Sequence, residues 1–157
     1  MVKFLLDEML KKTATWCRIF GLDSEFLSGR GDSELLAYAK KNDLIFVTRD
    51  LELSLRCEKQ RIKCIFVRSE AVEEQIAQIV KDTGTELTFP DKTRCPKCNG
   101  ELGIVTKEDI NREVPENVLT HQRFWKCKNC NKIYWEGSHW SNITKQYEKV
   151  KKLLSER

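Results

Sequence analysis

The sequence predicts an α/β domain with a mostly parallel sheet flanked by helices, then a small cysteine-rich module and a C-terminal helix. Residues 2–83 alternate short apolar runs with amphipathic segments and short loops, the order of parallel βα units. After Pro90 this alternation gives way to cysteine pairs, asparagines and aromatic residues. We therefore place the α/β domain at residues 1–90, the cysteine-rich module at 91–140 and an amphipathic helix at 141–157.

The apolar runs predict strands, and the amphipathic segments between them predict helices. Strands are expected at 2–6, 22–27, 44–48 and 63–68, and helices at 8–20, 33–41, 51–59 and 71–83. Gly21 and Gly84 follow the first and last of these helices, where glycine often ends a helix. The final helix has an apolar stripe, so we expect it to pack against another element. The stripe consists of Ile143, Tyr147, Val150 and Leu154.

Composition narrows the class of protein. Hydrophobic residues make up 40% of the chain, which is enough for a folded core and argues against disorder. The formal charge of +4 permits nucleic-acid binding without requiring it. No apolar run is long enough to cross a membrane, and the N-terminus lacks a signal-peptide pattern. We therefore expect a cytoplasmic, reducing location without a membrane partner, where the seven cysteines favour metal over disulfides.

Two C-x-x-C pairs, CPKC (95–98) and CKNC (127–130), predict a metal site. Each pair can present two sulfurs to one ion because the chain turns tightly between its cysteines. Four thiolates satisfy tetrahedral zinc and leave no open coordination position, so we expect a structural zinc ion. The predicted ligands are Cys95, Cys98, Cys127 and Cys130. The module is accordingly interpreted as a zinc ribbon.

Other uses of the cysteines stay open at this point. The four can hold an iron–sulfur cluster, or form two disulfides, which a reducing location disfavours. A thiol redox enzyme needs a C-x-x-C at a helix start in a thioredoxin-like setting, which two matched pairs fit poorly. His121 and His139 are expected to be surface or packed residues because four sulfurs complete the site.

Three aspartates stand at predicted strand-to-helix junctions. Asp7 follows the first strand, Asp32 the second and Asp50 the third. Each alone is explained by helix capping, since aspartate accepts hydrogen bonds from free backbone N–H groups. In a parallel sheet, however, all three lie toward the carboxyl edge, where α/β folds place their ligands. Carboxylates brought together repel one another, and Mg²⁺ or Mn²⁺ relieves that repulsion. Such a cluster suits metal-assisted hydrolysis of phosphodiesters.

Several longer segments resemble one known family. They are FLLDEML (4–10), WCRIFGLD (16–23), GDSELLAYAKKNDLIFVTRD (31–50), the two C-x-x-C pairs and IYWEGSHW (133–140). Together they resemble the PIN-like nucleases of the Mut-seven C-terminal RNase type, over nearly the whole chain. The T-x-D element at Thr48 to Asp50 is similar to that of PIN domains generally, and YWEGSHW after the cysteine pairs is more specific to this subgroup.

The resemblance implies a PIN-like domain fused to a zinc ribbon, with metal-dependent RNase activity. It implies that Asp7, Asp32 and Asp50 are catalytic and bind Mg²⁺ or Mn²⁺. Many PIN nucleases have a further acidic residue, for which residues 11–28 offer only Asp23 and Glu25.

Cationic side chains near the acids are candidate RNA contacts, because they can hold the phosphates that flank the cut. These are Lys11, Arg18, Arg30 and Arg49, of which Arg18 is expected on the polar side of the first helix. Aromatic residues around the ribbon can stack bases, but the favoured interpretation is that they build its small core. They are Trp125, Tyr134, Trp135 and Trp140.

Two functions follow from this sequence. The first is a metal-dependent endoribonuclease with RNA as partner, whose ribbon assists RNA binding. The alternative is a non-catalytic RNA- or ribosome-binding module, suggested by the missing fourth acid, the ribbon and a basic stripe on the final helix. The stripe consists of Lys145, Lys149 and Lys152.

Overall fold

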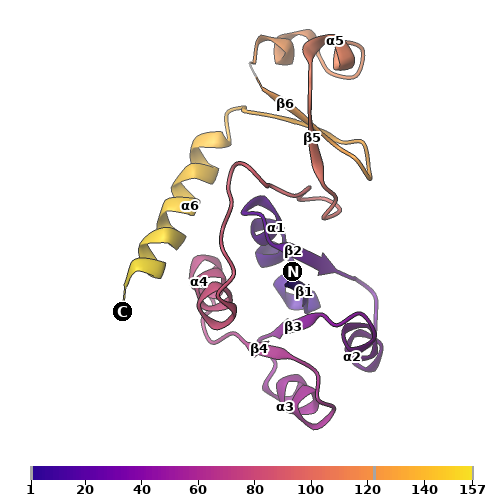
Figure 1. The fold of residues 1–157 in the computed structure, drawn as a ribbon, viewed down its shortest axis with the longest axis vertical. Helices are drawn as coiled ribbons and strands as arrows, with labels where there is room; N and C mark the ends of the chain where they lie inside the picture. The colour runs from indigo at the N-terminus through magenta and orange to yellow at the C-terminus, as the bar shows by residue number, and fades with distance from the viewer. Residues whose placement is uncertain (1, 122, 157) are drawn as a thin grey trace.

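The first sheet of the computed structural model, which describes residues 2–121 and 123–156, contains four parallel strands. They are β1 (Lys3–Leu6), β2 (Asp23–Phe26), β3 (Ile45–Thr48) and β4 (Cys64–Phe66), in the order β2-β1-β3-β4 (Figure 1). Lys3 pairs with Asp23 across β1 and β2, and Phe4 pairs with Ile45 across β1 and β3. The parallel sheet predicted from the alternation is therefore confirmed.

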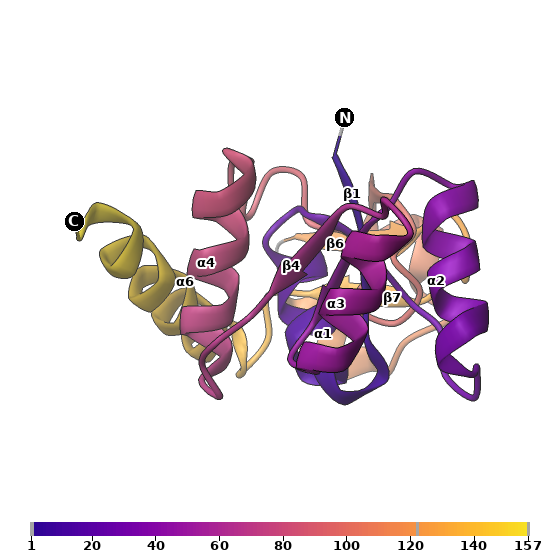
Figure 2. The same cartoon turned by 90° about the horizontal axis from the view of Figure 1, so that it is seen from below.

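Helices cover both faces of this sheet. On one face lie α1 (Lys11–Ile19) and α4 (Val72–Thr83), and on the other α2 (Asp32–Lys41) and α3 (Leu51–Lys59), as Figure 2 shows from a second side. The single helix predicted at 8–20 divides into a 3₁₀ turn, η1 (Glu8–Leu10), and α1. Gly84 ends α4 in the left-handed conformation, as predicted.

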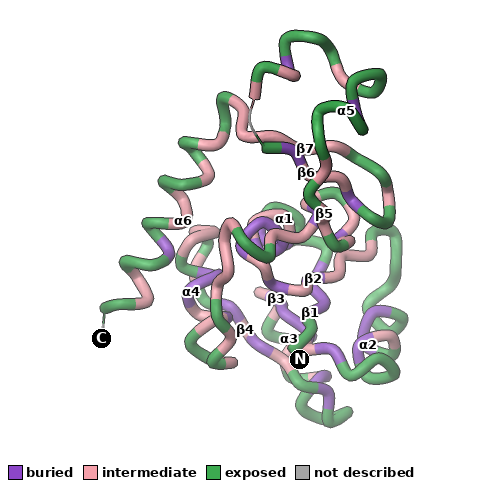
Figure 3. Tube along the Cα trace, turned by 45° about the horizontal axis from the view of Figure 1, so that its top comes forward, coloured by how far each residue is buried: buried purple, intermediate pink, exposed green. Residues whose placement is uncertain are grey.

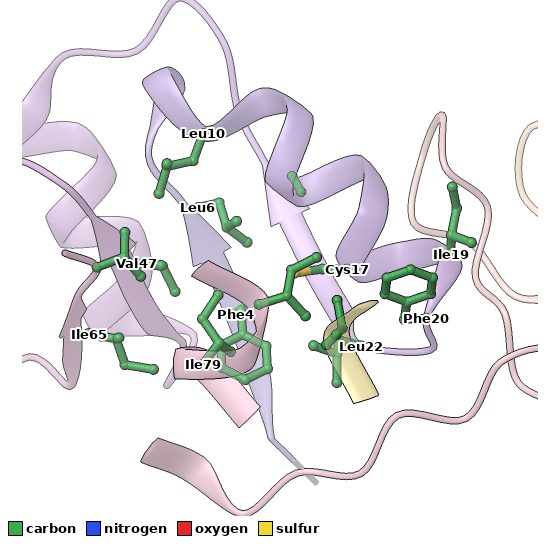
Figure 4. Packing of buried hydrophobic residues seen from close by; sticks show 14 residues of the cluster. Phe4, Leu6, Leu10, Cys17, Ile19, Phe20, Leu22, Val47, Ile65 and Ile79 are labelled. Atoms are coloured by element: carbon green, nitrogen blue, oxygen red, sulfur yellow. The ribbon is translucent and has the colours of Figure 1, made fainter. Parts of the chain in front are cut away.

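Strand β1 supplies both halves of the core because its side chains alternate between the faces. Phe4 and Leu6 pack with α1 and α4, whereas Leu5 packs with α2 and α3. Figure 4 shows Phe4 and Leu6 beside Val47 of β3, Ile79 and other buried side chains on the first face. Figure 3 shows that burial concentrates along β1 and β3, the central strands.

The cysteine-rich segment forms a second, antiparallel sheet, which we call the ribbon. Its strands are β5 (Leu102–Val105), β6 (Phe124–Cys127) and β7 (Ile133–Trp135), in that order. Between β5 and β6 lie α5 (Lys107–Ile110) and the 3₁₀ turn η2 (Glu116–Thr120). Ile110, Val118 and Phe124 form a small separate core beneath them.

The last helix, α6 (Trp140–Ser155), packs against α4, as both ribbon views show (Figures 1 and 2). Val150 is fully buried, and Ile143, Tyr147 and Leu154 pack on the first core. Tyr147 also contacts Phe20, directly after α1, and Phe89 of the connecting segment, with ring centroids 5.3 and 5.2 Å apart. The predicted apolar stripe of this helix is thus its packing face.

The proposed division of the chain at about Pro90 stays a prediction. Met1, Gln122 and Arg157, which fall in its three segments, lie outside the described residues. Among the helices in the described part of the chain, none combines the length and apolarity needed to span a membrane.

Replacing Val150 tests how firmly α6 is docked. We expect Val150→Ala to lower the free energy of unfolding by about 1–3 kcal/mol, because it opens a cavity between α6 and α4. Lys149→Ala, an exposed neighbour on the same helix, should change it by less than about 0.5 kcal/mol. Urea unfolding monitored by circular dichroism compares the two. Equal effects would contradict a docked α6.

Candidate active site and metal centre

The strand order indicates a candidate ligand site between β1 and β3. From β1 the chain passes first to β2 on one side and then to β3 on the other, so the order reverses between them. In open α/β sheets, ligands bind at such a reversal, outside the carboxyl ends of the strands. Asp7 follows β1 directly, and Thr48 is the last residue of β3, with Asp50 two positions later.

A chain of hydrogen bonds joins Asp7 to the T-x-D element. The Thr48 hydroxyl donates to Asp7 Oδ2 at 2.7 Å and accepts from the Asp50 backbone N–H at 3.0 Å. Asp7 Oδ1 accepts from the Glu8 backbone N–H at 2.8 Å. Asp7 is only 4% exposed and Thr48 is fully buried, so this edge is held rigidly. Each Asp7 oxygen keeps one lone pair available for a further donor or a cation.

The three predicted acids differ in their placement. Asp50 caps α3 by accepting from the Leu53 N–H at 3.2 Å, and Asp7 caps η1. Asp32 is exposed and lies inside the first turn of α2, whose N-cap is Gly31. Within residues 2–121 and 123–156, no hydrogen bond joins Asp32 to Asp7 or Asp50. The structure therefore links the Asp7 carboxylate to the Asp50 backbone through Thr48.

Direct coordination of one ion brings ligand atoms within a few ångströms of one another. We looked for at least three His, Cys, Asp or Glu side chains whose ligand atoms lie this close together. Among the described residues, the four cysteines meet this condition. In the conformation described, the three aspartates do not form such a group. This differs from the single carboxylate cluster expected from the order of the strands.

Neither Asp23 nor Glu25 adds to the acidic edge. The Asp23 carboxylate accepts from Asn99 Nδ2 at 2.7 Å and lies 3.8 Å from Arg94 Nη2. Glu25 accepts from the Tyr38 hydroxyl at 2.6 Å. Both carboxylates thus have structural partners within the described residues, away from Asp7.

The four cysteines of the ribbon are positioned to bind a metal ion, as predicted. Their sulfur atoms all lie within 4.8 Å of one another, with Cys95–Cys130 at 3.7 Å and Cys98–Cys127 at 3.4 Å. Tetrahedral zinc with Zn–S bonds of about 2.3 Å would separate its sulfurs by about 3.8 Å. The cysteines are free thiols rather than disulfides.

Both cysteine pairs form the same tight turn, which we call a knuckle. An asparagine follows each pair in the left-handed conformation, Asn99 with φ 69° and Asn131 with φ 66°. The Asn99 N–H donates to Cys95 O at 2.8 Å, and the Asn131 N–H donates to Cys127 O at 3.0 Å. Asparagine tolerates this conformation better than most residues. The repeated C-x-x-C-N pattern was therefore a sequence signal for both knuckles.

Hydrogen bonds prepare Cys98 as a thiolate. Burial by itself raises the pKa of this thiol, but hydrogen bonds from Asn129 and Cys127 outweigh it and lower the pKa to about 6. The Asn129 side-chain N–H donates to Cys98 Sγ at 3.4 Å. Metals bind the thiolate, so these hydrogen bonds favour the metal-binding form of Cys98.

The first knuckle docks on the α/β domain through buried polar contacts. Asn99 Oδ1 accepts from the Ser24 backbone N–H at 3.0 Å, on the free side of edge strand β2. Arg18 of α1 donates to Ser24 O at 2.7 Å and to Pro96 O at 2.9 Å. Arg18, Ser24 and Asn99 are all buried. This contact was not predicted from the sequence.

The four cations predicted to contact RNA fall into different environments. Arg18 is only 7% exposed and bound to two carbonyls, and burial lowers its pKa, so it is not on the polar side of α1 as expected. Arg30 is exposed and pairs with Glu34 at 3.3 Å. Arg49 is half-buried, 4.0 Å from Glu70, while Lys11 is exposed.

A polar pocket of about 660 Å³ lies between α1 and the first knuckle. Lys11, Arg18 and Lys97 line it together with Glu8, the residue after Asp7. Lys97 stands between the cysteines of the first pair, and sequence reasoning missed it because only the fold brings it beside α1. The pocket thus offers cationic groups next to the acidic edge.

The remaining cysteines do not form a reactive site. Cys17 is fully buried, and burial raises its pKa to about 12. Burial likewise raises the pKa of Cys57 to about 12, with a smaller contribution from Cys64. Thiols that stay protonated are poor nucleophiles, so Cys17 and Cys57 act as small apolar residues of the core.

The fold and these sites define an α/β protein with an acidic ligand edge and a tetrahedral cysteine site for a metal ion. The chain belongs to the Mut7-C RNAse domain family, whose profile matches residues 2–147. Family membership indicates ribonuclease activity with RNA as the substrate. No curated protein and no solved structure matches the chain significantly.

Substituting Asn99 tests the docking of the first knuckle. We expect Asn99→Ala to lower the free energy of unfolding by about 1–3 kcal/mol more than Asn131→Ala, because it leaves the buried Ser24 N–H without a partner. Asn131 is the matched control, since it has the same backbone conformation but is exposed. Denaturant unfolding of both metal-loaded variants measures the difference. Similar losses would show that docking does not depend on this side chain.

Substituting Gly100 tests whether the two knuckles must pack closely for the four sulfurs to bind a metal ion. A Cβ at this position would lie 2.7 Å from Cys127 Sγ, whereas a Cβ at Gly103 would lie 3.3 Å from the flexible Lys128 side chain. We expect Gly100→Ala to weaken metal binding by at least about tenfold, equivalent to about 1.4 kcal/mol, and Gly103→Ala to leave it nearly unchanged. Competition with a chromogenic chelator provides the readout. Unchanged affinity in both variants would contradict the close sulfur packing.

Proposed function

We propose that this protein is a metal-dependent endoribonuclease whose active site lies at the carboxyl ends of β1 and β3. The observation that carries the proposal is the hydrogen bonding of Thr48 to both the Asp7 carboxylate and the Asp50 backbone, at the reversal of strand order. Membership of an RNase domain family supplies the reaction class. The proposed catalytic residues are Asp7, Asp50 and Asp32.

The acids fit a hydrated divalent cation better than a dehydrated one. Mg²⁺ keeps several waters and is commonly held by one or two carboxylates, which suits an Asp7–Asp50 pair with Asp32 reaching the ion through water. Such an ion neutralises a phosphate and lowers the pKa of a bound water. Thr48 fixes the Asp7 carboxylate, and the Asp50 cap fixes its neighbour, so the pair is oriented before RNA arrives.

We also propose that the cysteine site holds zinc and is structural. The sulfur separations are close to those of a tetrahedral zinc site, and four protein ligands leave no position for substrate. The ribbon then assists RNA binding by holding Lys97 at the pocket that Lys11 also lines. Arg49, Arg30 and Arg18 remain proposed contacts, with Arg18 acting chiefly by positioning the knuckle.

Asp7→Asn tests the proposed active site. With Mg²⁺ or Mn²⁺ present, we expect it to reduce cleavage of single-stranded RNA by at least about 100-fold, because the amide cannot bind the cation as a charged ligand. Asp43→Asn is the matched control: it lies before β3, at the opposite edge of the sheet, in a left-handed conformation that asparagine also adopts. It should cleave like the wild type.

The same assay distinguishes endonuclease from exonuclease activity. A circular RNA has no ends, so its linearisation by the wild type, dependent on the divalent ion, is expected of an endonuclease. Equal cleavage by wild type and Asp7→Asn would place the activity elsewhere or in a contaminant. Cleavage confined to linear RNA would reject the endonuclease assignment.

A non-catalytic RNA- or ribosome-binding module is the second candidate. It is favoured by the spacing of the acids, since the described residues include no group of three carboxylates around one point. This reading predicts salt-sensitive RNA binding that survives Asp50→Asn, and no binding of Mn²⁺ at millimolar concentration in calorimetry. Mn²⁺ binding that Asp7→Asn removes would favour the nuclease.

A further inference from the structure

A second pocket, of about 440 Å³, lies between the ribbon, the start of α6 and the connecting segment before the first knuckle. Its lining is mostly apolar and strongly aromatic. Phe89, Trp125, Tyr134, Trp135 and Trp140 all contribute to it. Its volume falls in the range of sites that hold small planar ligands. We call it the aromatic pocket.

The aromatic side chains of this pocket are only partly buried in the core of the ribbon. Trp135 packs on that core, but Trp125, Tyr134 and Trp140 are half-buried and keep surface toward the pocket. Trp125 and Trp140 are nearly parallel, with an interplanar angle of 7° and centroids 5.8 Å apart. Ile104, which is 84% exposed, stands on the same lining. The pocket therefore presents flat π surface to solvent.

The rings are held in place by one another and by residues outside the pocket. Phe89 packs against Trp140 at 5.3 Å and against Phe20, directly after α1, at 6.1 Å, both between centroids. The Tyr134 hydroxyl lies 3.0 Å from Cys95 Sγ, so its ring position depends on the metal centre. A platform fixed before binding loses little entropy when a ligand stacks on it.

The aromatic pocket is a neighbour of the polar pocket beside the acidic edge. Pro96 of the first knuckle lines both, and the adjacent residues Arg18 and Ile19 line one each. A strand whose phosphates lie against Lys11 and Lys97 can pass over Pro96 and reach the aromatic rings. Cations beside an aromatic platform are the combination used to bind single-stranded nucleic acid.

We propose that the aromatic pocket holds an unstacked nucleobase of the RNA strand that the protein cleaves. This inference rests on the proposed function for the identity of the ligand, but not on catalysis. Nucleobases suit the site because every base has a π face that stacks on indole or phenol rings. Continuity with the cationic pocket favours a base attached to a phosphate chain over an apolar side chain of a protein partner.

Binding is measured with the full-length, metal-loaded protein carrying Asp7→Asn, without added divalent ions, so that cleavage does not interfere. The probes are a short fluorescent oligouridylate and a strand of equal length whose riboses lack bases. We expect the oligouridylate to bind roughly 5- to 150-fold more tightly, the range for one stacked base. Fluorescence anisotropy gives both dissociation constants, and their ratio is the base advantage.

Two pocket variants and two matched controls locate that advantage. Trp125→Leu removes a stacking surface, and Ile104→Glu obstructs the pocket at a residue too exposed to affect folding. Both should reduce the base advantage to nearly one. Trp16→Leu, a tryptophan of α1 outside the pocket, and Leu55→Glu, an exposed leucine of α3, should retain it.

The outcomes separate this inference from the proposed catalysis. Equal binding of the two strands, absence of binding, or an advantage that survives both pocket variants would overturn the nucleobase site. An advantage lost only in the pocket variants supports it, even where the cleavage assay with Asp7→Asn gives a negative result. RNA cleavage without a base advantage would leave the catalytic proposal standing and remove this one.

Discussion

The docking of the first knuckle on edge strand β2 is the contact on which both candidate binding pockets depend. An edge strand exposes backbone groups that another strand would normally pair. Here the Asn99 side chain accepts from the Ser24 N–H, and Arg18 donates to the Ser24 carbonyl. Buried polar groups are costly unless they are matched in this way. Because Pro96 lines both pockets, the position of the knuckle determines the shape of each.

This contact also couples the metal centre to the α/β domain. Pro96, whose carbonyl accepts from Arg18, lies directly after Cys95 in the chain. A zinc ion with four thiolates carries a formal charge of about −2, which needs a counter-charge when partly buried. Burial lowers the pKa of Arg18, but the Cys95 and Cys98 thiolates oppose that effect. The buried guanidinium is therefore both a hydrogen-bond donor to the knuckle and an electrostatic partner of the metal site.

Sequence reasoning succeeded where a local pattern determines the structure. The apolar runs located the four parallel strands, and the spacing of the cysteines identified the metal site. It failed for Arg18, because helical periodicity describes one helix and cannot foresee carbonyls from residues 24 and 96. The role of Asp32 stays a prediction, since this residue is exposed in the first turn of α2, after the loop of residues 27–31. Strand order fixes the edge to which a loop returns, but not the path of that loop.

Acidic, cationic and aromatic groups follow one another along the axis of helix α1. Acids lie just before its N-terminus, cationic groups along it, and the aromatic pocket begins at Ile19, its last residue. Nine helical residues span about 14 Å at a rise of about 1.5 Å each. Because α1 is packed into the core and tied to the knuckle, we expect this separation to be set before RNA binds. Under the two proposals together, a base held in the pocket therefore sets the distance along the strand to the phosphate at Asp7.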